Sequence, residues 1–213
     1  MDNRAAASLL LLTLLAAGCA GGGTTSSTRS RAELTNPFLG PDYTAWLIGP
    51  ISRLATPQEE QQFLALQDDQ QAAAFVEAFW NRRDPAPDKP GNQIREAFEK
   101  RSTEADRRYG EAGYLGRRTD RGVVYVLYGN PAKSDFEVGT RPGSSPIEVW
   151  TYGADAPSGL DGKRPSAVYR FIKQGELTVL YGAGQPRTLI DPQGPRDSIR
   201  DPNRDPIPPP PPL

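Results

Sequence analysis

The sequence predicts an α+β domain in which about three N-terminal helices pack on one face of a small antiparallel β-sheet of about four strands. Three observations predict this fold. Apolar residues recur at helical spacing between about residues 57 and 109, and β-branched and aromatic runs occupy about residues 123–181. Polar Gly/Thr/Ser-rich and Pro-rich segments lie towards the two ends and contain too few apolar residues to bury a core, so we expect disordered flanks. A chain of 213 residues suits one such domain.

Two consecutive helices are expected first, at about residues 57–66 and 69–82. Thr56 followed by Glu59 three residues later is a capping-box pattern, which is typical of a helix start. Asp68 provides the start signal of the second helix. That helix then carries apolar residues at the i, i+3, i+4, i+7 and i+8 positions of a buried stripe, namely Ala72, Phe75, Val76, Phe79 and Trp80.

A third helix is expected from Asn92 to about Tyr109. The preceding segment RRDPAPDKPGN ends the second helix, because proline cannot continue a helix, and Asn92 is a favourable N-cap. The apolar stripe of this helix is narrow and its remaining surface is charged, as on a helix whose outer face is solvated.

Four strands are expected at residues 123–128, 147–152, 167–172 and 177–181, with a short turn at 173–175 between the last two. Aromatic residues on strands opposite helices belong more often to a core than to a surface that stacks on polysaccharide. We therefore interpret five aromatic residues as core and leave a polysaccharide partner as the alternative: Trp80, Trp150, Tyr152, Tyr169 and Tyr181.

Composition excludes several classes of function. The 25 Lys and Arg residues nearly balance the 26 Asp and Glu residues, so no overall field would attract nucleic acid. The chain has no histidine, which excludes imidazole-dependent hydrolases and the usual zinc ligand. Its single cysteine, Cys19, allows no internal disulfide and no thiolate cluster. We expect no metal and no cofactor.

The N-terminus resembles a bacterial lipoprotein signal. An apolar stretch at residues 5–17 is too short to span a bilayer and leads through small residues into Cys19. The resemblance implies that residues 1–18 are a signal peptide, that Cys19 is the lipidated first residue of the mature protein, and that the acyl chains hold it on the membrane. An ordinary secretory signal is the alternative. Residues 19–35 are expected to form a flexible tether.

Three ordered blocks carry a family resemblance: WLIGPISRLATPQEEQQFLAL, FVEAFWNRRDPAPDKPGN and GRRTDRGVVYVLYGNP. Together they resemble the GWxTD-domain family of bacterial envelope proteins, from about Tyr43 to Tyr152. The sequence departs from the family at three points: Arg117 stands where the family has its tryptophan, Phe98 stands where a histidine is common, and residues 132–135 replace an acidic run that often follows the Gly-x-Pro turn. The resemblance implies a domain at residues 36–190 that faces the periplasm from the outer membrane, but no established reaction.

The tail at residues 191–213 is rich in proline and is expected to be disordered, ending in a stiff polyproline segment. It could serve as a second contact with a partner or as a spacer.

Two groups of polar and charged residues stand out as candidate sites. Five residues are expected to form a structural lock between the end of the second helix and the entrance to the first strand: Arg82, Arg83, Asp84, Thr119 and Asp120. Three arginines are candidates for binding a partner or an anion: Arg117, Arg118 and Arg121. The alternative is a site in which Asp84 and Asp120 act as acid and base.

From these observations we expect a lipid-anchored cell-envelope protein that acts as a non-catalytic interaction or assembly module and binds another envelope protein. The alternative is an enzyme that uses carboxylates and arginines, or a protein that binds an anionic glycan or phosphate. The lack of histidine favours the first interpretation.

Overall fold

The computed structural model describes residues 32–139, 145–182 and 185–186. The predicted signal peptide, the lipidation candidate Cys19 and the Pro-rich tail lie outside the described residues. The described part begins with a 3-10 helix, η1 (Ala32–Leu34), whose Leu34 is buried in the core. Ordered structure therefore reaches back at least to Ala32, into the segment expected to be a tether.

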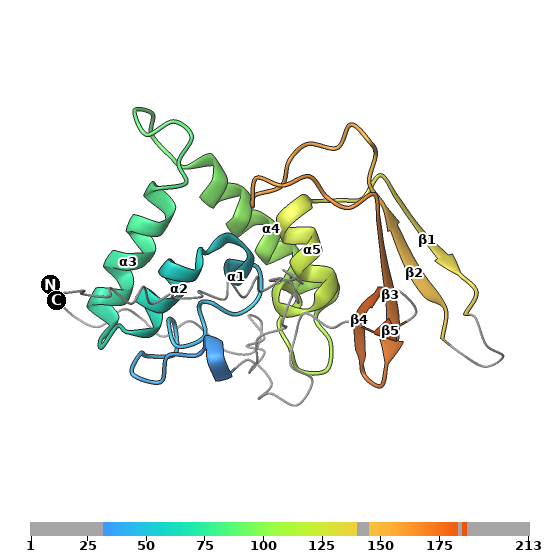
Figure 1. Ribbon diagram of the computed structural model, residues 1–213, viewed down its shortest axis with the longest axis horizontal. Helices are drawn as coiled ribbons and strands as arrows, with labels where there is room; N and C mark the ends of the chain where they lie inside the picture. The colour runs from blue at the N-terminus through green and yellow to red at the C-terminus, as the bar shows by residue number, and fades with distance from the viewer. Residues whose placement is uncertain (1–31, 140–144, 183–184, 187–213) are drawn as a thin grey trace, which may run out of the picture.

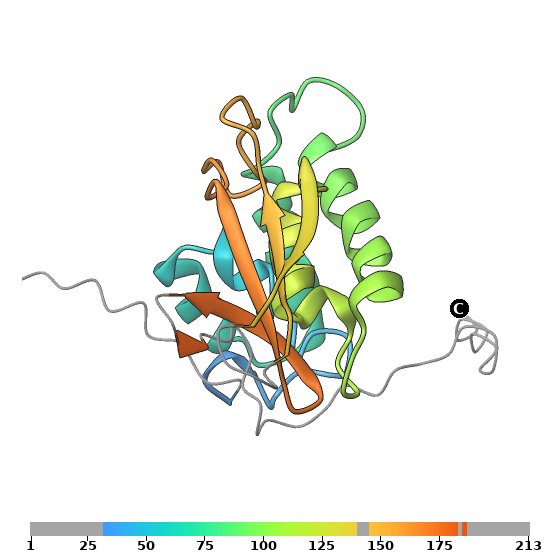
Figure 2. The same cartoon turned by 90° about the vertical axis from the view of Figure 1, so that its right-hand side faces the viewer.

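The helices precede the sheet in the chain, and Figure 2 shows them behind it, on one face. The helical elements are α1 (Ile51–Leu54), α2 (Pro57–Leu64), α3 (Asp69–Asn81), α4 (Gln93–Tyr109), the 3-10 helix η2 (Gly116–Arg118) and α5 (Asp120–Tyr128). The strands are β1 (Lys133–Glu137), β2 (Ile147–Thr151), β3 (Val168–Gln174), β4 (Leu177–Gly182) and β5 (Gln185–Pro186). All neighbouring strands are antiparallel, in the order β1-β2-β3-β4-β5 (Figure 1). The predicted α+β fold is confirmed.

The three predicted helix starts are present. The Thr56 hydroxyl accepts the Glu59 N–H, and the Glu59 carboxylate accepts the Thr56 N–H, so the capping box is complete. Asp68 and Asn92 cap α3 and α4 through their side chains. The helices end at Leu64, Asn81 and Tyr109, within two residues of the sequence-based boundaries.

The prediction of a strand at residues 123–128 is wrong, because these residues form most of α5. Every residue from Val123 to Leu127 is buried, since α5 contacts both α4 and β4. The stretch from Val123 to Tyr128 contains no polar position between apolar ones, so it has no helical periodicity to distinguish it from a buried strand. The first strand is instead β1, whose residues are all exposed.

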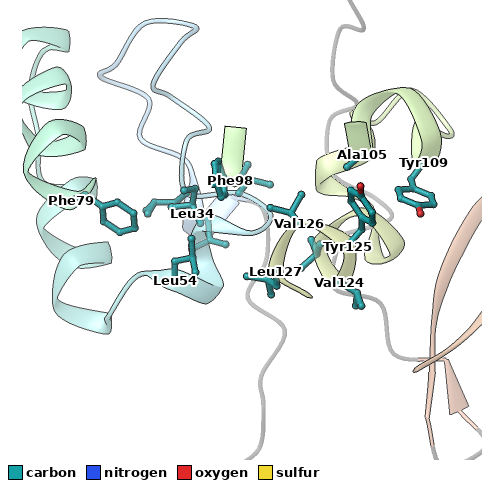
Figure 3. Close-up of a cluster of buried hydrophobic side chains, with 14 of the residues drawn as sticks. Leu34, Leu54, Phe79, Phe98, Ala105, Tyr109, Val124, Tyr125, Val126 and Leu127 are labelled. Carbon is teal, nitrogen blue, oxygen red and sulfur yellow. The ribbon is translucent and has the colours of Figure 1, made fainter. Parts of the chain in front are cut away.

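One core cluster extends from the N-terminal helices to the sheet. Figure 3 shows Leu34, Leu54 and Phe79 on one side of it, and Val126 of α5 on the other. The predicted core role of Trp80, Trp150 and Tyr152 is confirmed, since all three are buried, whereas Tyr169 and Tyr181 are partly exposed.

Candidate functional site

The segment from Gly116 to Gly122 joins α4, α5 and the sheet through close backbone packing. A Cβ atom added to Gly116 would lie 1.9 Å from the Ala105 carbonyl oxygen of α4. A Cβ atom added to Gly122 would lie 1.7 Å from the Gly116 carbonyl oxygen. Only glycine fits at both positions, because neither backbone oxygen can move away without displacing a helix.

Thr119 and Asp120 hold the start of α5, and both are fully buried. The Thr119 hydroxyl accepts the Gly122 N–H at 3.1 Å and donates to the Gly116 carbonyl at 2.8 Å, so it caps the helix. The Asp120 carboxylate accepts the Leu180 N–H of β4 at 2.6 Å. The Asp120 charge lies at the N-terminal end of α5, where the helix dipole favours an anion. Thr119 therefore caps α5, and Asp120 fastens it to the sheet.

Arg117 and Arg118, which the sequence left available for a partner, both contact the domain itself. The Arg117 backbone and guanidinium N–H groups donate to the Asp106 carboxylate of α4 at 2.8 Å. Arg118 donates to the Ala45 carbonyl oxygen at 3.1 Å. At the position of the family tryptophan, this chain thus has an arginine that forms an ion pair with α4.

Arg121 lies in a half-buried charged network between α5 and the sheet. It donates to Glu111 at 3.0 Å and to Glu148 of β2 at 3.2 Å. Glu111 also accepts the backbone N–H and the hydroxyl of Thr178, and Glu148 accepts the indole N–H of Trp150. Charged groups in such a network mainly fix the position of the sheet.

Arg82 and Arg83 bind Glu59, a residue that the sequence indicated only as part of a capping box. Glu59 accepts from Arg82 at 2.9 Å and from Arg83 at 2.6 Å. Arg83 also donates to the Leu54 and Phe79 carbonyl oxygens, so it connects the ends of α1 and α3 to the start of α2. We call Glu59, Arg82 and Arg83 the Glu59 cluster.

The pKa of Glu59 reflects two opposing effects. Burial alone would raise it, but hydrogen bonds from Arg83, the Thr56 backbone and Arg82 lower it to about 2. Glu59 is therefore ionised at neutral and mildly acidic pH.

The expected lock between the second helix and Asp120 is corrected by these contacts. Arg82 and Arg83 pair with Glu59, whereas Arg121 pairs with Glu111 and Glu148. The Asp84 carboxylate closes its own turn by accepting the Ala86 N–H, as expected for an aspartate before a proline. The candidate residues form two separate structural groups, with different partners.

The two most exposed large apolar side chains of the described residues lie at the other end of the molecule, on and just beyond β1. This strand is the edge of the sheet, and its outer side pairs with no strand in the described part of the chain (Figure 1). Phe136 is 71% exposed, and Val138, just beyond the strand, is 92% exposed. A shallow open hollow lies beside both residues. Large apolar side chains this exposed are typical of an interaction surface when they adjoin one another.

The described residues contain no group of three or more side chains suited to hold a metal ion. In the same part of the chain, no helix has the length and apolar character needed to cross a membrane.

These contacts define an α+β domain in which a Gly-x-x-Thr-Asp turn joins two helices to a sheet. The GWxTD domain family model matches residues 29–161, more than half of the chain, so the protein belongs to the GWxTD-domain family. At both ends, the matched range extends beyond the resemblance seen in the three sequence blocks, which runs from about Tyr43 to Tyr152. Comparisons with curated proteins and with solved structures gave no match.

Proposed function

We propose that this protein is a lipid-anchored component of the bacterial cell envelope whose GWxTD domain binds another envelope protein and catalyses no reaction. The observation that carries the proposal is the β1 edge with its exposed Phe136 and Val138. The role of Thr119 and Asp120 as fully buried structural residues supports a non-catalytic domain, because an acid or base must reach its substrate.

The chemistry of β1 favours an extended segment of the partner as the occupant. The outer edge of a strand presents backbone N–H and carbonyl groups, which an added strand can satisfy. Charged side chains alternate along β1 at Lys133, Asp135 and Glu137, and such charges discourage unspecific strand pairing. Phe136, between them, supplies the apolar contact that a specific partner can bury.

Crosslinking tests the β1 surface. We expect a photoreactive residue at Val138 of the membrane-anchored protein to crosslink to one envelope protein in cells, and a second substitution, Phe136→Ser, to reduce the adduct severalfold. Phe136 is mostly exposed, so this change should leave the melting temperature unaltered.

The matched control carries the photoreactive residue at Lys100, which is exposed on α4. Equal adducts from both positions, or an adduct that Phe136→Ser leaves unchanged, would contradict the proposal. An adduct between two copies of this chain would show that the β1 surface mediates self-association and does not bind another envelope protein.

The anchor is supported by the sequence from Leu15 to Cys19 and is tested by fractionation. We expect Cys19→Ser to move the protein from the membrane pellet to the soluble fraction, because acyl chains contribute about 0.8 kcal/mol per buried methylene. A globomycin-insensitive precursor, or a Cys19→Ser protein that stays in the pellet after a carbonate wash, would contradict lipid anchoring.

A further inference from the structure

A cavity of about 230 Å³ opens between α5, the sheet and the loop that connects β2 to β3. Its floor is apolar and includes Val124 and Leu127 of α5 and Leu180 of β4. Figure 3 shows both residues of α5 among the buried side chains. Since a water takes about 30 Å³ of liquid volume, the cavity has the size of about eight waters and suits a correspondingly small molecule.

Two cations line this cavity, Arg53 of α1 and Lys163 of the loop. Both are exposed, and neither forms an ion pair with a carboxylate among the described residues. The third charged group is Asp161, which accepts the Tyr128 hydroxyl and the Lys163 backbone N–H, each at 3.0 Å. Asp161 is therefore held in place by two hydrogen bonds, and the charged groups that line the cavity are two cations and one carboxylate.

Tyr128 and Tyr169 form an aromatic wall of the cavity, with ring centroids 6.0 Å apart. Burial raises the pKa of Tyr128, and Tyr169 and Asp161 raise it further, so its hydroxyl stays protonated and keeps donating to Asp161.

We propose that this cavity binds a small monocarboxylate, with its apolar body over Val124 and Leu180 and its carboxylate facing Arg53 and Lys163. An anion would compensate the two cations, which form no ion pair within the described part of the chain, and an apolar body would replace water over Val124, Leu127 and Leu180. A cationic ligand would meet two cations and only one carboxylate, Asp161, and a neutral ligand would compensate neither cation. This inference is independent of the β1 surface.

The test is an NMR titration of backbone amide signals with hexanoate, using the full chain that carries Cys19→Ser to avoid detergent. A ligand of about eight non-hydrogen atoms should bind with a Kd of about 1 mM. We expect saturable shifts in α5, around Asp161 and in β4. Hexanol, acetate and hexylamine should each bind at least tenfold more weakly.

The combined substitution Arg53→Gln and Lys163→Gln should weaken hexanoate binding at least tenfold and leave the melting temperature unchanged, because both side chains are exposed. The matched control is Lys173→Gln, an exposed lysine of β3 outside the cavity, which should leave binding unchanged. The proposal is overturned if hexanoate gives no saturable shifts, if hexylamine binds as well as hexanoate, or if the double variant retains the affinity of the parent chain.

Discussion

Gly122→Ala should destabilise the domain by more than about 3 kcal/mol, although alanine normally stabilises a helix by about 1 kcal/mol relative to glycine. The new Cβ would lie 1.7 Å from the Gly116 carbonyl oxygen. That oxygen also accepts the Thr119 hydroxyl, so moving it would disturb the cap of α5. Urea unfolding of the purified chain would measure the loss as a lower midpoint at unchanged slope.

The matched control is Gly175→Ala in the turn between β3 and β4. Gly175 has φ of 62° and no atom within 4 Å of an added Cβ, so the cost should be limited to about 1 kcal/mol of backbone strain. A Gly122→Ala chain that is as stable as the parent, or as the Gly175→Ala chain, would show that η2 and α5 do not pack as described.

The caps and the aromatic strands could be predicted from the sequence because their signals are local. Thr56, Asp68 and Asn92 lie within three residues of the N–H groups that they accept. The residues of β2, β3 and β4 have the β-branched and aromatic composition of half-buried strands. A short turn at Gly175 fixes the order of the last two.

The wrong predictions concern α5 and β1, two elements whose secondary structure depends on tertiary contacts. Residues 123–127 of α5 are all buried, so every position is apolar and the sequence has no alternation that would identify a helix. β1 is a short charged edge strand, and its sequence KSDFE lacks the apolar alternation of a strand that faces a core.

The partners of the candidate-site residues lie far away in the chain, and the sequence alone does not show which residues pair. Arg118 contacts Ala45, 73 residues away, and Arg83 contacts Glu59, 24 residues away. In sequence, an arginine with a distant partner is indistinguishable from one that is available to a ligand. The structural roles of Thr119 and Asp120 could be predicted more readily from the sequence, because a Thr-Asp pair is a common start of a helix.

Glu59→Gln should destabilise the protein by about 3 kcal/mol at neutral pH, because it leaves Arg82 and Arg83 without their carboxylate. The size follows from the pKa of Glu59, which falls from 4.5 to about 2 on folding. A carboxyl group with a lowered pKa stabilises the folded state fully above pH 4.5. That stabilisation is lost as the pH falls towards 2, when both states become protonated.

The difference between the parent chain and Glu59→Gln should therefore be constant above about pH 5 and shrink towards zero near pH 2. Unfolding free energies from urea titrations at several pH values would measure it. Glu99→Gln is the matched control, since Glu99 forms an exposed i,i+4 pair with Arg95 and should contribute at most about 0.5 kcal/mol. If the Glu59→Gln difference equals that of the control, or persists undiminished in acid, the three helix ends are not held together through the Glu59 carboxylate.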